Sequence, residues 1–271
     1  MGRANRLSRL RPGALSVKWA GDRSGALPVT AISIAAMVAG WWVLALLNGD
    51  PSVLPGPGVV LPLAWHELTQ GDLIYHLAVT LRRVALAFLI AMSVGGAIGL
   101  LMGSSRGIDR WLDPWLIAFL NLPALVTIVL CYLWIGLNEA AAVTAVAINK
   151  IPTVVITIRE GTRALDRQLT DVATVFRMSR RARLRHVIAP QLGPYIASAG
   201  RSGISLIWKI VLVVEFLGRS DGIGFKLHLY FQLFRVDMVL AYALSFVIVM
   251  LLIEALILRP WEARATRWRR P

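Results

Sequence analysis

The chain has 271 residues, of which 57% are hydrophobic and 16% charged, and its mean hydropathy is +0.65. Soluble domains carry about a quarter of their residues as charge, so this composition excludes an ordinary soluble domain and predicts a membrane protein with several spans. The net charge of +14 is therefore first of all a topology signal, and the single cysteine, Cys131, excludes an intramolecular disulfide.

The first predicted elements are a basic amino-terminal arm over 1–27 and a transmembrane helix over 28–47. The arm is long and the residues after 47 lack a cleavage pattern, so we interpret this helix as retained rather than as a removed signal peptide. An external segment over 48–83 follows. The prolines and glycines of DPSVLPGPG prevent a helix at its start, and the near-helical spacing of apolar residues beyond them predicts a helix along the membrane surface.

A core of five further helices is predicted over 84–258, which makes about six spans in all. Each contains an apolar stretch near the 20 residues or so that a helix needs to cross the hydrocarbon core. Gly95, Gly99 and Gly103 recur every four residues in the first of these helices, which predicts the close approach of another helix. The five stretches are 84–103, 114–136, 140–158, 194–218 and 238–258.

Lysine and arginine residues orient the bundle, because cytoplasmic loops retain positive charge. Of the 29 such residues, 21 lie in the arm, in the loop near Arg106, in the loop 159–193 and in a basic tail over 259–271, whereas the alternate loops hold only five. We therefore expect both termini and the loop 159–193 in the cytoplasm.

Four charged residues inside the predicted spans are candidates for a translocation pathway, because an ionised group in a span is costly and tends to face the bundle interior or water. Three cations and one carboxylate suit a small anion. Simpler interpretations stay open: Lys150 snorkels to the interface, Arg201 lies near the cytoplasmic end, and Lys209 pairs with Glu215. The candidates are Lys150, Arg201, Lys209 and Glu215.

The loop 159–193 is predicted to form two short helices. The first begins at Asp166, and Ser179 is placed to cap a second helix that ends before Pro190. A hairpin that has no core of its own to join is typical of a docking element, although an arginine-rich anchor on anionic lipid head groups is an open alternative. The apolar face of the first helix holds Leu169, Val172, Ala173 and Phe176.

The same loop resembles the cytoplasmic motif of bacterial ABC importer permeases, in which E-A-A is followed after three residues by Gly and nine residues later by I-x-L-P. Asp171, Val172 and Ala173 stand at the E-A-A positions. Arg177 stands where the family has Gly, which removes the residue that best suits a sharp bend with positive φ. Val187, Ala189 and Pro190 take the last three positions.

The resemblance extends over most of the chain after residue 50 and is closest to permeases for nitrate, taurine and alkane sulfonates. The segments that show the resemblance are LPGPGVV at 54–60, GDLIYHLAVTLRRVALAF at 71–88, GLLMGSSRGIDRWLDP at 99–114, WIGLNEAA at 134–141, and Glu215 with GIG at 222–224. The resemblance implies a type I ABC importer permease in a bacterial inner membrane. The docking residues it implies are Asp171, Val172, Ala173, Phe176, Arg177, Ser179, Arg180, Arg181 and Pro190.

The partners implied are separate ABC ATPase subunits, a second permease copy or paralogue, an external solute-binding protein and membrane lipid. No catalytic residue is predicted, because no lysine follows a glycine as a phosphate-binding loop requires, so ATP and Mg²⁺ are expected on the ATPase subunit. The four histidines have no ligand spacing, so we predict no metal. A transporter or channel working without ATP is the alternative, and RNA binding ranks last because the basic loop lacks interleaved aromatic residues.

Overall fold

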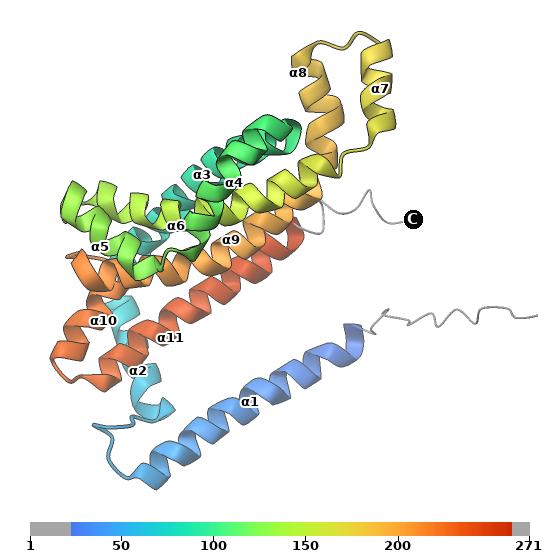
Figure 1. Cartoon of the computed structure of the whole chain (residues 1–271). Helices are drawn as coiled ribbons and strands as arrows, with labels where there is room; N and C mark the ends of the chain where they lie inside the picture. The colour runs from blue at the N-terminus through green and yellow to red at the C-terminus, as the bar shows by residue number, and fades with distance from the viewer. Residues whose placement is uncertain (1–22, 262–271) are drawn as a thin grey trace, which may run out of the picture.

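The computed structural model describes residues 23–261, which form a bundle of α-helices with no strand in this range (Figure 1). The predicted all-α membrane bundle is therefore confirmed. The helices are α1 (Arg23–Asn48), α2 (Pro57–Thr69), α3 (Leu73–Ser104), α4 (Arg106–Asn121), α5 (Ala124–Ile135), α6 (Glu139–Arg163), α7 (Arg167–Val175), α8 (Arg180–Arg183), α9 (Ala189–Gly218), α10 (Ile223–Gln232) and α11 (Val236–Ile253), with π-helical turns at Leu184–Ile188 and Glu254–Leu258.

Four of the described helical stretches are long and apolar enough to cross a membrane, and α4 with α5 makes a fifth if this bent pair is one span. The apolar part of α1, Ile32–Asn48, is shorter. This agrees roughly with the six predicted spans. The predicted basic arm and basic tail lie mostly at 1–22 and 262–271, outside the described residues.

Helix α1 lies apart from the other helices in Figure 1. Its link to α2 is the turn after Asn48, in which the Ser52 backbone N–H and hydroxyl donate to the Asp50 carboxylate at 2.8 and 2.7 Å. These hydrogen bonds lower the pKa of the Asp50 carboxyl. The Trp41 indole N–H then donates to the Pro55 carbonyl at 3.2 Å, so the chain entering α2 is tied back to α1.

Helix α3 begins at Leu73, well before the expected start of the second span at 84. The residues between contain no proline or glycine, so nothing in this stretch stops the helix. Arg82 and Arg83 consequently lie inside the helix rather than at its mouth.

The third predicted span is broken into α4 and α5, whose axes differ by 97°. Pro123 follows Leu122 at the break, and both residues have extended backbone angles. Proline has no N–H to continue the helical ladder and disfavours helical geometry in the residue before it, which explains the break.

The close packing predicted from the spaced glycines is confirmed between α3 and α6. A Cβ atom placed on Gly99 would lie 2.8 Å from the Val155 carbonyl oxygen and 2.9 Å from Ile158 Cβ. Any larger residue would separate the two backbones, so α3 and α6 form the tightest pair of the bundle.

The predicted caps of the α7–α8 hairpin are confirmed. Asp166 accepts a hydrogen bond from the Gln168 N–H at 2.8 Å, and the Ser179 hydroxyl accepts one from the Ala182 N–H at 3.2 Å. The predicted end before Pro190 is wrong, because α8 continues through the π turn Leu184–Ile188 into α9. The register shift of a π turn accommodates a residue that cannot donate, so the proline is tolerated here.

Candidate functional site

A buried cluster of charges joins four segments at the end of the bundle opposite α7 and α8 (Figure 1). We call it the arginine cluster: Arg83 of α3, Glu139 of α6, Glu215 of α9 and Asp221 before α10. The Arg83 side chain is 1% exposed and that of Glu215 is 0% exposed. Arg83 donates to Glu215 at 2.8 Å, to Glu139 at 2.8 Å and to the Asp221 carbonyl at 2.9 Å, and it also pairs with the Asp221 carboxylate.

Neighbouring groups complete the hydrogen bonds of the arginine cluster. The Thr80 hydroxyl and the Gly224 N–H donate to Glu215 at 2.9 and 2.8 Å, and the Ile223 N–H donates to Thr80 at 2.8 Å. Arg219 pairs with Glu139 at 3.2 Å. A charge buried inside a protein is tolerated only when it is paired and hydrogen-bonded. The arginine cluster therefore fixes the ends of α3, α6, α9 and α10 to one another.

Sequence reasoning missed Arg83, which it counted as a loop charge. The available signal was two charges of opposite sign, Arg83 and Glu215, each with apolar residues on at least one side. Such charges in membrane helices pair with one another more readily than with lipid. The pairing of Lys209 with Glu215 is not found, because both Glu215 oxygens are engaged by Arg83, Thr80 and Gly224.

The four pathway candidates do not come together in the described structure. Glu215 lies in the arginine cluster, and Arg201 lies 3.7 Å from Glu254 towards the other end of α9. Lys150 is buried in the middle of α6, and Lys209 is exposed on α9, with its ammonium 5.5 Å from the centre of the Trp208 ring.

Polar side chains gather on one side of α6 and α9. We call this the polar face: Asn149 and Thr153 of α6, and Ser202, Ser205 and Lys209 of α9. On both helices these residues lie away from the side that packs against α3. The serine hydroxyls donate to carbonyls of their own helix, which lipid tolerates, but an exposed lysine within a span costs about 3 kcal/mol or more against lipid. The polar face therefore suits water or a protein partner.

A cavity of about 380 Å³ lies between α3, α4 and α6. Its lining consists of apolar and aromatic side chains such as Ile98, Trp115 and Val155. Such a lining offers nothing to orient a charged solute, so this cavity is a poor candidate for an anion site.

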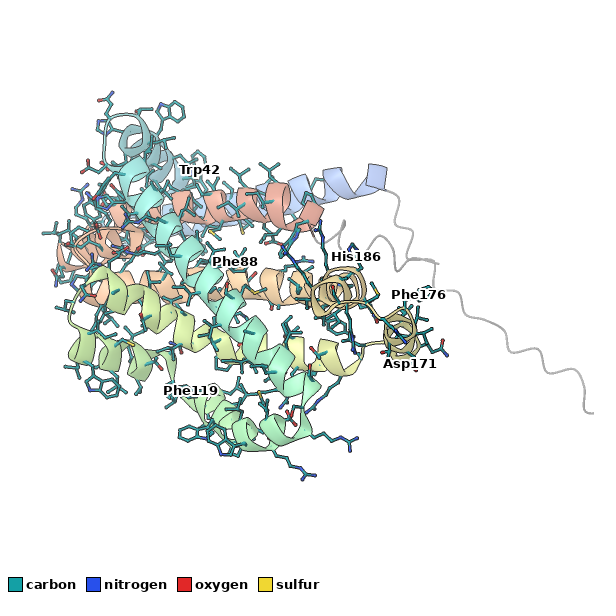
Figure 2. All side chains as sticks on the ribbon, turned by 90° about the horizontal axis from the view of Figure 1, so that it is seen from above. Trp42, Phe88, Phe119, Asp171, Phe176 and His186 are labelled. Carbon is teal, nitrogen blue, oxygen red and sulfur yellow. The ribbon has the colours of Figure 1, made fainter. Side chains whose placement is uncertain are left out.

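The hairpin of α7 and α8 projects from the bundle (Figure 1), and Figure 2 shows Asp171 and Phe176 at α7, on the side of the hairpin away from the bundle. Ala173 is buried within the hairpin, whereas Val172 is half exposed and Phe176 is 75% exposed. Asp171, Arg177, Ser179, Arg181 and Pro190 are also exposed, and the Arg180 side chain is outside the described part of the structure. The hairpin thus presents apolar side chains among charges, beyond the membrane helices.

Arg177 keeps the bend that glycine would favour, since its own φ is +47°. Its N–H donates to the Thr174 carbonyl and that of Met178 donates to the Ala173 carbonyl, each at 3.0 Å. These two bonds are the Schellman arrangement, with Arg177 at the position where glycine is usual. With Arg177 in place of glycine, the chain therefore still forms the Schellman bend, at the cost of backbone strain at Arg177.

Residues 95–259 match the family of binding-protein-dependent transport system inner membrane components, and the chain belongs to this family. It is accordingly the membrane permease subunit of an ABC importer and not an enzyme, since a separate subunit of such systems hydrolyses ATP. The family assignment favours this function over a transporter or channel that works without ATP.

Curated relatives extend over most of the chain. The putative aliphatic sulfonates transport permease protein SsuC of Bacillus subtilis is 29% identical over 262 residues, which cover 96% of this chain and 92% of the relative. The taurine transport system permease protein TauC of Escherichia coli is 27% identical over 93% of this chain and 94% of its own length. The nitrate import permease protein NrtB of Synechocystis is 28% identical over 72% of this chain and 74% of its own length.

A solved structure described as an amino acid ABC transporter with histidines has the same fold. Its TM-score is 0.60 at 24% identity, over 76% of this chain and 98% of that one. This likeness supports the helix arrangement alone.

Proposed function

We propose that the chain forms half of the pore of an importer for a small organic or inorganic anion, such as a sulfonate or nitrate. The solute arrives on an external binding protein, a second permease copy or paralogue completes the pore, and α7 with α8 docks on an ATPase subunit that carries ATP and Mg²⁺. The permease lies in a bacterial inner membrane, surrounded by lipid, with both termini cytoplasmic.

The observation that carries the proposal is the projecting hairpin. Val172 and Phe176 are exposed on a segment beyond the membrane helices, where lipid does not cover them. An amphipathic helix of this kind seats its apolar side in a groove of a partner, and its arginines pair with acidic groups around that groove. The partner is the ATPase, because the chain belongs to a family whose members rely on one.

The docking assignment is tested by Phe176→Ser, with Phe234→Ser as the matched control. Both rings are exposed, by 75% and 86%, and lie at opposite ends of the bundle. Loss of one buried ring weakens binding by about 2 kcal/mol, or about 30-fold. We expect Phe176→Ser to release the ATPase during purification of the complex while Phe234→Ser retains it. Equal retention by both variants contradicts the assignment.

A charge reversal gives the functional counterpart. Asp171→Lys should abolish solute uptake while membrane insertion stays intact, because Asp171 lies on the exposed hairpin and not in a span. Uptake at the wild-type rate with Asp171→Lys counts against docking through α7.

The anionic substrate class rests on charge and on the relatives. Lys209 lies on the polar face and Lys150 beside it in α6, and the relatives are named for sulfonates, taurine and nitrate. The polar face is the surface that a second permease would meet across a water-filled path, since lysine there is costly against lipid.

Lys209→Gln tests this part of the proposal, with Lys209→Arg as the control that keeps the charge. In proteoliposomes containing the whole importer, we expect Lys209→Gln to lower uptake of the anion at least tenfold, because a hydrogen bond to a charged group contributes about 1.5–3 kcal/mol. Assembly with the ATPase should be unaffected in both variants. Normal uptake by Lys209→Gln rejects Lys209 as a pathway group.

A further inference from the structure

Lys150 is a charged residue in the interior of a membrane helix. It lies about 16 Å of helical rise from one end of α6 and about 20 Å from the other, distances much longer than a lysine side chain. The residue is only 2% exposed. Snorkelling to either membrane interface is therefore ruled out in this conformation.

The ammonium group of Lys150 lacks a hydrogen-bond partner within the described residues 23–261. The carboxylates on α9 and on the π turn after α11 are engaged elsewhere, Glu215 by Arg83 and Glu254 by Arg201. A buried amine with no partner is a costly arrangement that packing alone does not require, because an apolar side chain of the same length fills the same space without the penalty.

The lysine lies in the seam where α6 meets α9. A Cβ atom on Gly203 of α9 would lie 3.2 Å from Lys150 Cε, and 3.5 Å from the ring of Phe88 of α3. Figure 2 shows Phe88 on α3 in the middle of the bundle. The missing side chain at Gly203 thus leaves the room that the lysine stem occupies, and α9 with α3 covers the amine.

The same lysine is next to the polar face. Asn149 precedes it on α6, so the two side chains diverge by about 100° around the helix axis, and Lys209 is on the neighbouring helix about 9 Å of rise beyond Gly203. A small parting of α6 from α9 on this side uncovers the Lys150 amine towards the polar face.

We propose that Lys150 is a second binding group for a small oxyanion, a sulfonate or nitrate, which becomes accessible from the polar face when α6 and α9 part during transport. This inference rests on the proposed anion importer. An anion that meets Lys150 only in the parted state favours that state, since a ligand shifts an equilibrium by its differential affinity for the two conformations. Binding of the solute and opening of the seam are then coupled through one side chain.

The first test replaces the charge and keeps the shape. Lys150→Met is compared with wild type in proteoliposomes holding the permease, its ATPase and its binding protein, with nitrate, ethanesulfonate and a neutral sugar as solutes. We expect the half-saturating concentration of the transported anion to rise at least tenfold, or uptake to be lost. Thermal stability of the assembled complex should be unchanged or higher, because the variant removes a buried unpaired charge.

The outcomes separate the two proposals. If wild type takes up the anion and Lys150→Met takes it up equally well, the role of Lys150 is overturned, while the proposed anion importer is retained. Uptake of the neutral solute alone by wild type overturns the substrate class and, with it, the inference. A variant complex that transports poorly and is also less stable than wild type indicates a packing role and overturns the inference as well.

The second test measures access to the seam. In a Cys131→Ala background, which removes the one natural thiol, Lys150→Cys is treated with an anionic methanethiosulfonate reagent in the whole importer. We expect no labelling at rest and rapid labelling during ATP turnover. Val154→Cys, fully buried against α3, is the control that stays unlabelled in both conditions. Failure of Lys150→Cys to react during turnover overturns the inference.

Discussion

Replacing Arg83 by methionine tests whether the arginine cluster holds the helix ends together. The change leaves Glu215 buried, with hydrogen bonds from Thr80 and Gly224 but without its Arg83 counter-charge. Removing one partner of a buried ion pair costs about 3–5 kcal/mol, and the two surviving hydrogen bonds place this case near 3. The adjacent Arg82 is the matched control, since its side chain is 60% exposed and its ion pair within residues 23–261 is with Glu139. Arg82→Met should therefore cost less than about 1 kcal/mol.

The assay is reversible unfolding of the purified permease in mixed detergent micelles, followed by tryptophan fluorescence. We expect the two variants to differ by about 2 kcal/mol or more in the free energy of unfolding. In the double variant Arg83→Met with Glu215→Met, much of the loss should be recovered, because no unpaired charge then remains in the cluster. Equal stability of Arg83→Met and Arg82→Met, or additive losses in the double variant, refutes the reasoning.

Two further predictions concern the backbone. Gly99→Ala should destabilise the same permease by about 1–3 kcal/mol, because the added Cβ would meet the α6 backbone. Gly96 has open space around it, so Gly96→Ala should not destabilise the permease. Equal effects of the two substitutions would contradict the packing of α3 on α6. Arg177→Gly should stabilise the hairpin by up to about 1 kcal/mol, because it relieves a strained φ but also gives the unfolded chain more freedom. Hydrogen exchange of the Met178 amide should become slower. Faster exchange of this amide would contradict the assignment of strain to Arg177.

Sequence patterns predicted the structural features that depend on residues close together in the chain. The apolar stretches of α6, α9 and α11, the close approach at Gly99 and the cap at Asp166 depend on neighbours in the sequence or on a short repeat, and each is found. The bend at Arg177 also follows from its position after α7, although the residue type argued against it.

Features that depend on distant partners were not predictable in this way. Arg83 and Glu215 are 132 residues apart, so no spacing rule brings them together. Helix α3 starts earlier than a charge-free span requires, because no proline or glycine interrupts residues 73–84. The continuation of the helix through Pro190 depends on a π turn, which no residue type in this stretch predicts. The buried state of Lys150 depends on the packing of α9 over it.

The passage of α8 through the π turn into α9 makes one unbroken helix from Arg181 to Gly218, 38 residues or about 57 Å long. In the proposed docking, force that the ATPase applies to the hairpin is transmitted along this single helix to its Glu215 end. Because Glu215 is paired with Arg83, the same movement would reach the ends of α3, α6 and α10 that the arginine cluster joins.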